Sequence, residues 1–230
     1  MPDYKAEAAK AALQLIKPGQ TIGLGAGSTI AHLVDMVSNN DTLKASVVFT
    51  SSSFKTTSLL HERGLRVISP SLLKHIEIYF DGCDQFDAEL NALKSGGGIH
   101  TTEKILASMA KEFILIGDEG KNAEKLDTKY PLVVEILPQA LQIVLARLAT
   151  MFPGAQIKQR ISTQKDGAVI TENGNMLVDI YFEKAIAPEI LNLEIKMIPG
   201  VVEHSLFYRM ATKALLAGKK GIIVYTPIGL

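Results

Sequence analysis

Residues 76–84 read Ile76-Glu77-Ile78-Tyr79-Phe80-Asp81-Gly82-Cys83-Asp84. The run from Ile76 to Phe80 is mostly apolar and predicts a strand. Asp81 and Asp84 follow directly where that strand ends. Open α/β sheets bind their ligands at the carboxyl ends of their strands, so the segment predicts both a sheet strand and a candidate site beside it.

Strands and helices alternate around this segment, which favours a doubly wound, mostly parallel sheet of the α/β class. Apolar residues recur at helical spacing in several segments, and the first of these ends at Pro18-Gly19. Short apolar runs between the helices predict strands. The predicted helices span residues 4–16, 30–37, 54–62 and 102–113, and the predicted strands span residues 21–25, 45–49, 76–80 and 113–117.

The pattern changes near Tyr130-Pro131. Strands are expected at 132–136, 156–157, 168–171, 176–182 and from 200, helices at 138–151 and 187–193, and a hairpin turn at 172–175. This order predicts a small α+β (ferredoxin-like) domain over residues 130–202. It would be inserted into a Rossmann-like catalytic domain of residues 1–129 plus 203–230, to which 206–216 and 221–225 return.

Composition narrows the classes of protein. The 24 basic and 24 acidic side chains cancel, so charge predicts no attraction to nucleic acid or to an anionic membrane. No apolar run approaches the roughly 20 residues of a membrane span, and residues 1–14 show no signal-peptide core. Cys83 is the single cysteine, so no internal disulfide can form. These features favour a cytoplasmic protein.

A glycine-rich segment, Gly23-Leu24-Gly25-Ala26-Gly27-Ser28-Thr29, falls on a predicted strand-to-helix turn. Glycines let the backbone approach a ligand, and Ser28 and Thr29 offer donors to an anion at the start of a helix. The segment matches neither a Walker A motif nor a Rossmann fingerprint. A phosphate-binding turn and a plain tight turn capped by serine are both open interpretations.

Two further segments fall at the same predicted sheet edge. Ser51, Ser52 and Ser53 follow the second strand, where they could cap the next helix, which is the more ordinary role, or hold substrate hydroxyls. Asp118 to Lys121 end another strand. Lys121 could balance a phosphate dianion there or lie on a surface loop.

Lys94 precedes Ser95-Gly96-Gly97-Gly98, and Glu103 follows shortly after. Taken singly, Asp81 and Asp84 could be turn residues, Lys94 a loop lysine and Glu103 a capping-box residue. Together at one sheet edge they provide an acid, a base and a cation, which is what enolisation beside a carbonyl requires. The chain's histidines show no ligand spacing with these acids, so no metal site is expected. Carboxylates flank Cys83, which predicts a raised thiol pKa and a poor nucleophile.

Together these motifs resemble the ribose-5-phosphate isomerase type A family over most of the chain. The resemblance implies an aldose-ketose isomerase of the non-oxidative pentose phosphate pathway that acts without metal or cofactor on a small sugar phosphate. It also implies a homo-oligomer, a dimer or a tetramer. The matching blocks are residues 25–29, 51–53, 81–84, 94–97, 103–104, 118–121, 131–135 and 198–202.

The resemblance also assigns roles. Glu103 would be the base that moves a proton between C1 and C2, and Asp81 would help to open the ring and shuttle hydroxyl protons. Lys94 would stabilise the enediolate oxygen, while Asp84 would hold substrate hydroxyls and orient Lys94. Ser28, Thr29 and Lys121, with Lys5, would bind the phosphate. The remaining substrate-binding residues would be Gly25, Ala26, Gly27, Ser51, Gly82, Cys83, Ser95, Gly96 and Gly97.

Several residues depart from the family pattern. Ala26 stands where Thr is usual, Gln85 where Glu is usual, and Ser95 where Gly is usual. Ser95 adds a Cβ where a positive φ is expected. Two alternatives therefore stay beside ribose 5-phosphate isomerisation: a divergent paralogue that isomerises another sugar phosphate, and a non-catalytic sugar-phosphate sensor.

Overall fold

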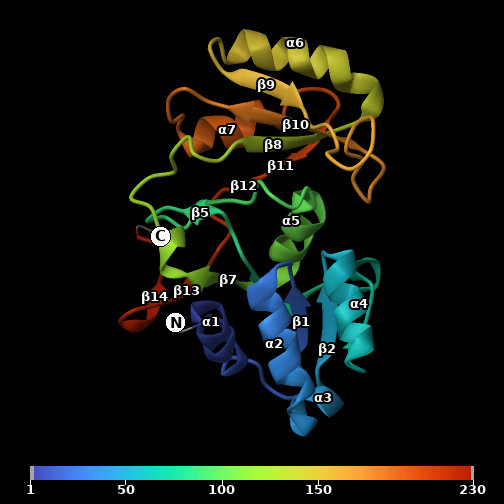
Figure 1. The fold of residues 1–230 in the computed structure, drawn as a ribbon, viewed down its shortest axis with the longest axis vertical. Helices are drawn as coiled ribbons and strands as arrows, with labels where there is room; N and C mark the ends of the chain where they lie inside the picture. The colour runs from blue at the N-terminus through green and yellow to red at the C-terminus, as the bar shows by residue number, and fades with distance from the viewer. Residues whose placement is uncertain (1–2, 229–230) are drawn as a thin grey trace.

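The segment that begins at Ile76 is the central strand of a seven-stranded sheet in a computed structural model that describes residues 3–228. The strands lie in the order β14-β13-β7-β4-β1-β2-β3 (Figure 1). Every pairing in this sheet is parallel except that of β13 with β14, which confirms the mostly parallel α/β class. The strands are β1 Thr21–Leu24, β2 Val48–Ser51, β3 Arg66–Val67, β4 Ile76–Asp81, β7 Ala110–Asp118, β13 Lys213–Gly218 and β14 Gly221–Tyr225.

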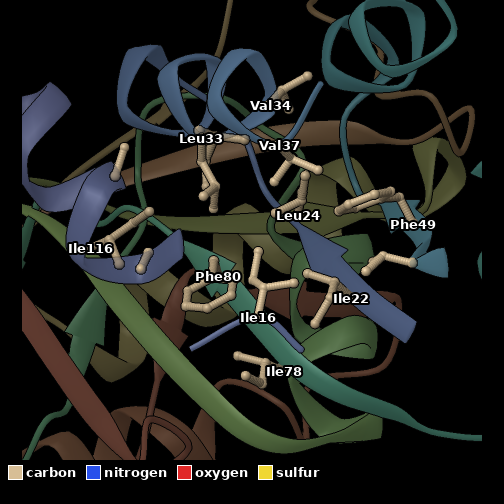
Figure 2. Packing of buried hydrophobic residues seen from close by; sticks show 14 of the residues in the cluster. Ile16, Ile22, Leu24, Leu33, Val34, Val37, Phe49, Ile78, Phe80 and Ile116 are labelled. Carbon is tan, nitrogen blue, oxygen red and sulfur yellow. The ribbon is translucent and has the colours of Figure 1, made fainter. Parts of the chain in front are cut away.

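Helices cover one face of this sheet with an apolar core. Figure 2 shows Leu33 of one helix packed with Leu24 of β1 and Phe80 of β4, all of them fully buried. Burying such side chains is the main favourable term in folding, at roughly 25 cal/mol per Å² of apolar surface. The helices of this part of the chain are α1 Tyr4–Leu13, α2 Ser28–Ser38, α3 Asp41–Ser46, α4 Phe54–Glu62 and α5 His100–Met109.

The opposite face packs against α5 and a small three-stranded sheet in the order β12-β6-β5. These strands are β5 Gln85–Phe86, β6 Ala92–Leu93 and β12 Leu206–Phe207. Strand β7 alternates accordingly: Ile114 and Ile116 join the first core, and Phe113 and Leu115 join the second. The sheet is therefore buried on both faces, as a doubly wound fold requires.

Residues beyond Tyr130 form a separate four-stranded antiparallel sheet in the order β11-β8-β10-β9 with its own apolar core. Figure 1 shows this sheet beside α6 and α7, with α5 between it and the parallel sheet. These elements are β8 Leu132–Ile136, α6 Leu141–Met151, β9 Gln156–Gln159, β10 Met176–Tyr181, α7 Pro188–Glu194 and β11 Val201–His204. The expected α+β part is present; its exact domain boundaries at 130 and 202 stay a prediction.

Some predicted elements were wrong in their bounds. Residues 45–49 are not one strand, because α3 runs to Ser46 and β2 begins at Val48. The helix predicted over 102–113 is wrong beyond Met109, because α5 spans His100–Met109 and β7 begins at Ala110. Residues 168–171 form only isolated bridges, Ile161 to Ala168 and Ile170 to Met176. Within residues 3–228, no helix is long and apolar enough to span a membrane.

Candidate active site

A cavity of about 340 Å³ opens where β1, β4 and β7 end, at the carboxyl edge of the parallel sheet. The loops after these strands supply most of its wall, and α5 supplies Glu103. The predicted site residues that line it are Lys5, Ala26, Gly27, Ser28, Thr29, Asp81, Gly82, Cys83, Asp84, Lys94, Gly96, Gly97, Glu103 and Lys121.

Asp81 is 1% exposed and is held from two sides. Its Oδ1 accepts hydrogen bonds from the backbone N–H groups of Gly82 at 2.8 Å and Ala26 at 3.3 Å. Its Oδ2 accepts one from the Tyr79 hydroxyl at 2.6 Å and lies 2.8 Å from Lys94 Nζ. Such a set of donors fixes the carboxylate in one orientation.

Gly25 makes this arrangement possible. Its N–H donates to the carbonyl of Phe80 at 2.9 Å, which brings the turn after β1 against the end of β4. A Cβ at Gly25 would lie 1.9 Å from Asp81 Cγ. Gly25 does not line the cavity itself, but only glycine leaves room for the Asp81 carboxylate.

Lys94 joins two carboxylates. Its Nζ lies 2.8 Å from Asp81 Oδ2 and 3.3 Å from Glu103 Oε1, and it donates to the Gly82 carbonyl at 2.5 Å. Burial alone would lower the pKa of Lys94, but the charges of Asp81 and Glu103 outweigh it and hold that pKa above its usual range. Lys94 is therefore a permanent cation inside the cavity.

Glu103 lies in the first turn of α5 and is 5% exposed. Burial raises its pKa from 4.5 to about 8; Lys94 opposes this rise and Asp81 adds to it. A carboxyl group poised near neutral pH can both take up and release a proton, which is the property of a general base.

The start of α2 forms the other wall of the cavity. Gly27 stands at the N-cap with φ 104°, and no side chain caps the helix. Ser28 is thus the first residue of α2 and not its cap, and both Ser28 and Thr29 line the cavity at the start of this helix, where backbone amides have no partner within the helix. Lys5 and Lys121 line the same cavity. A helix start with two nearby cations attracts an anion such as phosphate.

Besides Gly25, two predicted substrate-binding residues do not line this cavity. Ser51 lines a neighbouring cavity of about 420 Å³, and its hydroxyl bonds to the backbone of Ser53. Ser53 caps α4 by accepting from the Thr56 N–H at 3.2 Å, so capping is the role of this serine. Ser95 is not part of the cavity lining, and its hydroxyl donates to the Pro131 carbonyl at 2.5 Å.

The expectation of a positive φ at Ser95 was wrong. Positive φ occurs instead at Gly98, where a Cβ would lie 2.7 Å from Leu177 Cδ1.

Asp84 does not form an ion pair with Lys94 in the part of the chain that the structure describes. It accepts a hydrogen bond from the Ser95 N–H at 2.5 Å, and the ion pairs of Lys94 within residues 3–228 are with Asp81 and Glu103.

The residues that depart from the family pattern differ in whether they face the cavity. Gln85 points away from the cavity, because its side-chain amide donates to the Asp127 carbonyl at 3.1 Å. Of Ala26, Gln85 and Ser95, Ala26 is the one that lines the cavity. Cys83 also lines it, and burial raises its pKa to about 12, although Lys94 and Lys121 oppose the rise; Asp84 and Asp81 add smaller contributions to it. The prediction of a raised pKa is confirmed, although burial is the larger cause.

Sequence analysis missed Tyr79, since one tyrosine in an apolar strand gives the same signal as a core residue. Its hydroxyl bonds to both Asp81 and, at 3.1 Å, Ser52. Ile116, Gly117 and Asp118 also line the cavity, as the end of a strand at this edge could have indicated. Within residues 3–228, no group of three or more His, Cys, Asp or Glu side chains is placed to hold a metal ion.

Comparison with known proteins agrees with this geometry. The family described as ribose 5-phosphate isomerase A (phosphoriboisomerase A) matches residues 48–221, and a DeoR C terminal sensor domain matches residues 1–71. The ribose-5-phosphate isomerase A of Methanocaldococcus jannaschii is 38% identical over 224 residues, which are 96% of each chain.

Solved structures agree over the whole fold. The ribose 5-phosphate isomerase A structure from Methanocaldococcus jannaschii superposes with a TM-score of 0.90 at 35% identity, covering 97% of this chain and 98% of that one. A D-ribose-5-phosphate isomerase in complex with phospho-erythronic acid gives a TM-score of 0.90 at 31% identity with the same coverage. Because sequence and structure both match over nearly the whole chain, and because the cavity lies at the carboxyl edge of the parallel sheet, this chain belongs to the ribose 5-phosphate isomerase A family.

Proposed function

We propose that the cavity at the carboxyl edge of the parallel sheet is where this isomerase interconverts ribose 5-phosphate and ribulose 5-phosphate through an enediol. One observation carries the assignment of roles: a buried lysine, Lys94, lies between Asp81 and Glu103. The cavity volume of about 340 Å³ suits a small ligand.

Glu103 takes the proton from C2 of the open-chain aldose. The electron pair of that C–H bond forms the C1=C2 double bond, and the carbonyl oxygen O1 becomes an enediolate oxygen. Lys94 stabilises this negative charge, an effect worth about 3 kcal/mol for one well-placed donor. The O2 hydroxyl proton then passes to O1 with help from Asp81, and Glu103 returns its proton to C1 to give the ketose.

The phosphate of the substrate binds at the start of α2. The amides of Ser28 and Thr29 and the ammonium groups of Lys121 and Lys5 provide donors and positive charge there. Asp84 lines the same cavity and holds substrate hydroxyls. Lys94, Asp81 and Glu103 form what we call the Lys94 cluster. The phosphate bound at the start of α2 and the reacting carbons held at the Lys94 cluster together orient the sugar chain between them.

The test is turnover of ribose 5-phosphate by the purified protein, with and without a chelator, beside Glu103→Gln. Glu62→Gln is a matched control, because this residue is exposed at the end of α4, away from the cavity. We expect metal-independent turnover in wild type and control, and a loss of at least about 1,000-fold in Glu103→Gln. Retained activity in Glu103→Gln would refute the assignment.

A panel of other pentose and hexose phosphates tests the paralogue alternative, in which Ala26 alters substrate choice. Thermal stabilisation by ribose 5-phosphate without turnover would favour the sensor alternative. The match to a sensor domain ends at residue 71 and so includes none of the Lys94 cluster.

We also propose a cytoplasmic homo-oligomer, a dimer or a tetramer. Exposed apolar side chains beside the four-stranded sheet support association: Ile143 of α6 at 51%, Leu193 of α7 at 61%, and Met197 in the turn after α7 at 72% exposure. The single free cysteine suits a reducing compartment. Light scattering after size exclusion tests the first proposal, and cell fractionation the second.

A further inference from the structure

The first turn of α5, which carries Glu103, is held from outside rather than by a helix cap. Ile99 stands at the N-cap and makes no side-chain capping bond. On the flank away from the cavity, His100 Nε2 lies 3.3 Å from the Glu203 carbonyl, and Lys104 Nζ donates to the His204 carbonyl at 2.7 Å. Both contacts are with β11 of the four-stranded sheet. The same sheet therefore supports the turn from which Glu103 projects.

The third contact of this turn is with Glu135 of β8. Glu135 is 0% exposed, and its Oε2 accepts a short hydrogen bond from the Thr101 hydroxyl. Its Oε1 accepts from Thr171 Oγ1 at 2.8 Å, Asn175 Nδ2 at 2.8 Å and Asn173 Nδ2 at 3.2 Å. One carboxylate thus joins β8, the turn at 171–175 and the start of α5.

Glu135 is held as an anion without a direct ion pair among the described residues. Burial would raise its pKa, but the four side-chain hydrogen bonds lower it more. Hydrogen bonds to a charged acceptor are about twice as strong as neutral ones, so they restrain their donors tightly. A buried ionic group adds little net stability compared with apolar packing. The structural role of Glu135 is therefore to hold its hydrogen-bond donors in place.

Thr101 is the member of this network that belongs to α5, and it lies two residues before Glu103. We infer that Glu135, acting through Thr101, is a positioning residue that sets the location of the Glu103 carboxyl relative to Lys94. This inference rests on the proposed role of Glu103 as base.

Thr101→Val removes the hydroxyl that links Glu135 to α5 and keeps the side chain's shape. Thr171→Val is the matched control, because it removes another donor to the same carboxylate and leaves the link to α5 intact. Thr101→Ser restores the hydroxyl. We expect kcat to fall about 10- to 100-fold in Thr101→Val with KM within about twofold, since a misplacement near 1 Å costs up to about 100-fold. Thr171→Val and Thr101→Ser keep kcat within about threefold of wild type.

Melting temperatures separate positioning from general damage. A kcat in Thr101→Val equal to that in Thr171→Val, at similar melting temperatures, overturns the inference. If Thr101→Val does not fold, Thr101→Ala replaces it, because alanine also removes the hydroxyl that links Glu135 to α5; an unchanged kcat there also overturns the inference.

A readout independent of turnover is the titration of the Glu103 carboxyl by ¹³C NMR. Displacement of the Glu103 carboxyl relative to Lys94 shifts its midpoint away from about 8 in Thr101→Val and not in Thr171→Val. An inactive wild type with this shift present defeats the proposed function and leaves the positioning role standing. An active wild type with no shift and no change in kcat defeats the positioning role alone.

Discussion

Glu103→Gln should stabilise the fold while it abolishes turnover. Burial raises the Glu103 pKa from 4.5 to about 8, with Lys94 opposing and Asp81 assisting. Between these values the folded chain holds a proton at Glu103 that the unfolded chain has released. The free energy of unfolding therefore falls as pH rises through this window, by about 1.4 kcal/mol per pH unit at most. Glutamine resembles the protonated acid and has no such dependence.

The difference in stability between Glu103→Gln and wild type should thus grow with pH. From a pH of about 5.5 to about 7.5 it should increase by up to about 3 kcal/mol in favour of glutamine. Urea unfolding of both proteins at the two pH values measures it, provided that the slopes against urea agree. Glu62→Gln controls for the loss of a charge at an exposed site. A difference that does not change with pH, or a glutamine variant that is less stable at the higher pH, would refute the account of Glu103 as a buried, proton-holding acid.

Three other perturbations test the site. Tyr79→Phe removes one hydrogen bond to Asp81 and should lower the free energy of unfolding by about 1–3 kcal/mol, measured by urea unfolding. It should also lower kcat with little change in KM in steady-state kinetics, and an unchanged kcat would contradict the role given to this hydrogen bond. Gly25→Ala places a Cβ 1.9 Å from Asp81 Cγ, so turnover should fall at least about 100-fold even where circular dichroism shows a folded chain. Lys94→Met leaves two carboxylates facing each other, which should raise the pKa of Glu103 above about 8 in an NMR titration; a lowered pKa would reverse the assigned electrostatics.

Much of the fold was predictable because it depends on local patterns. The apolar run before Asp81 and the alternation of strands with helices indicate a parallel sheet, and its carboxyl edge then collects the motifs. The errors have local causes too. Apolar Val47 and Val48 adjoin the polar helix α3, and this made residues 45–49 look like one continuous strand. The small sheet of β5, β6 and β12 was missed because two-residue strands carry no periodicity.

The sequence by itself determined the alternation of strands and helices along the chain, the positions of Asp81 and Glu103 on their elements, and the glycines of the turn after the first strand. Each of these follows from neighbours along the chain. Only the tertiary structure decided that Lys94 pairs with Asp81 and Glu103, and that Ser51 faces a different cavity. It also decided that Glu135 reaches Thr101, 34 positions away. Such contacts depend on how separate sheets and helices pack, because a hydrogen bond or ion pair forms only when both groups are brought within a few ångströms.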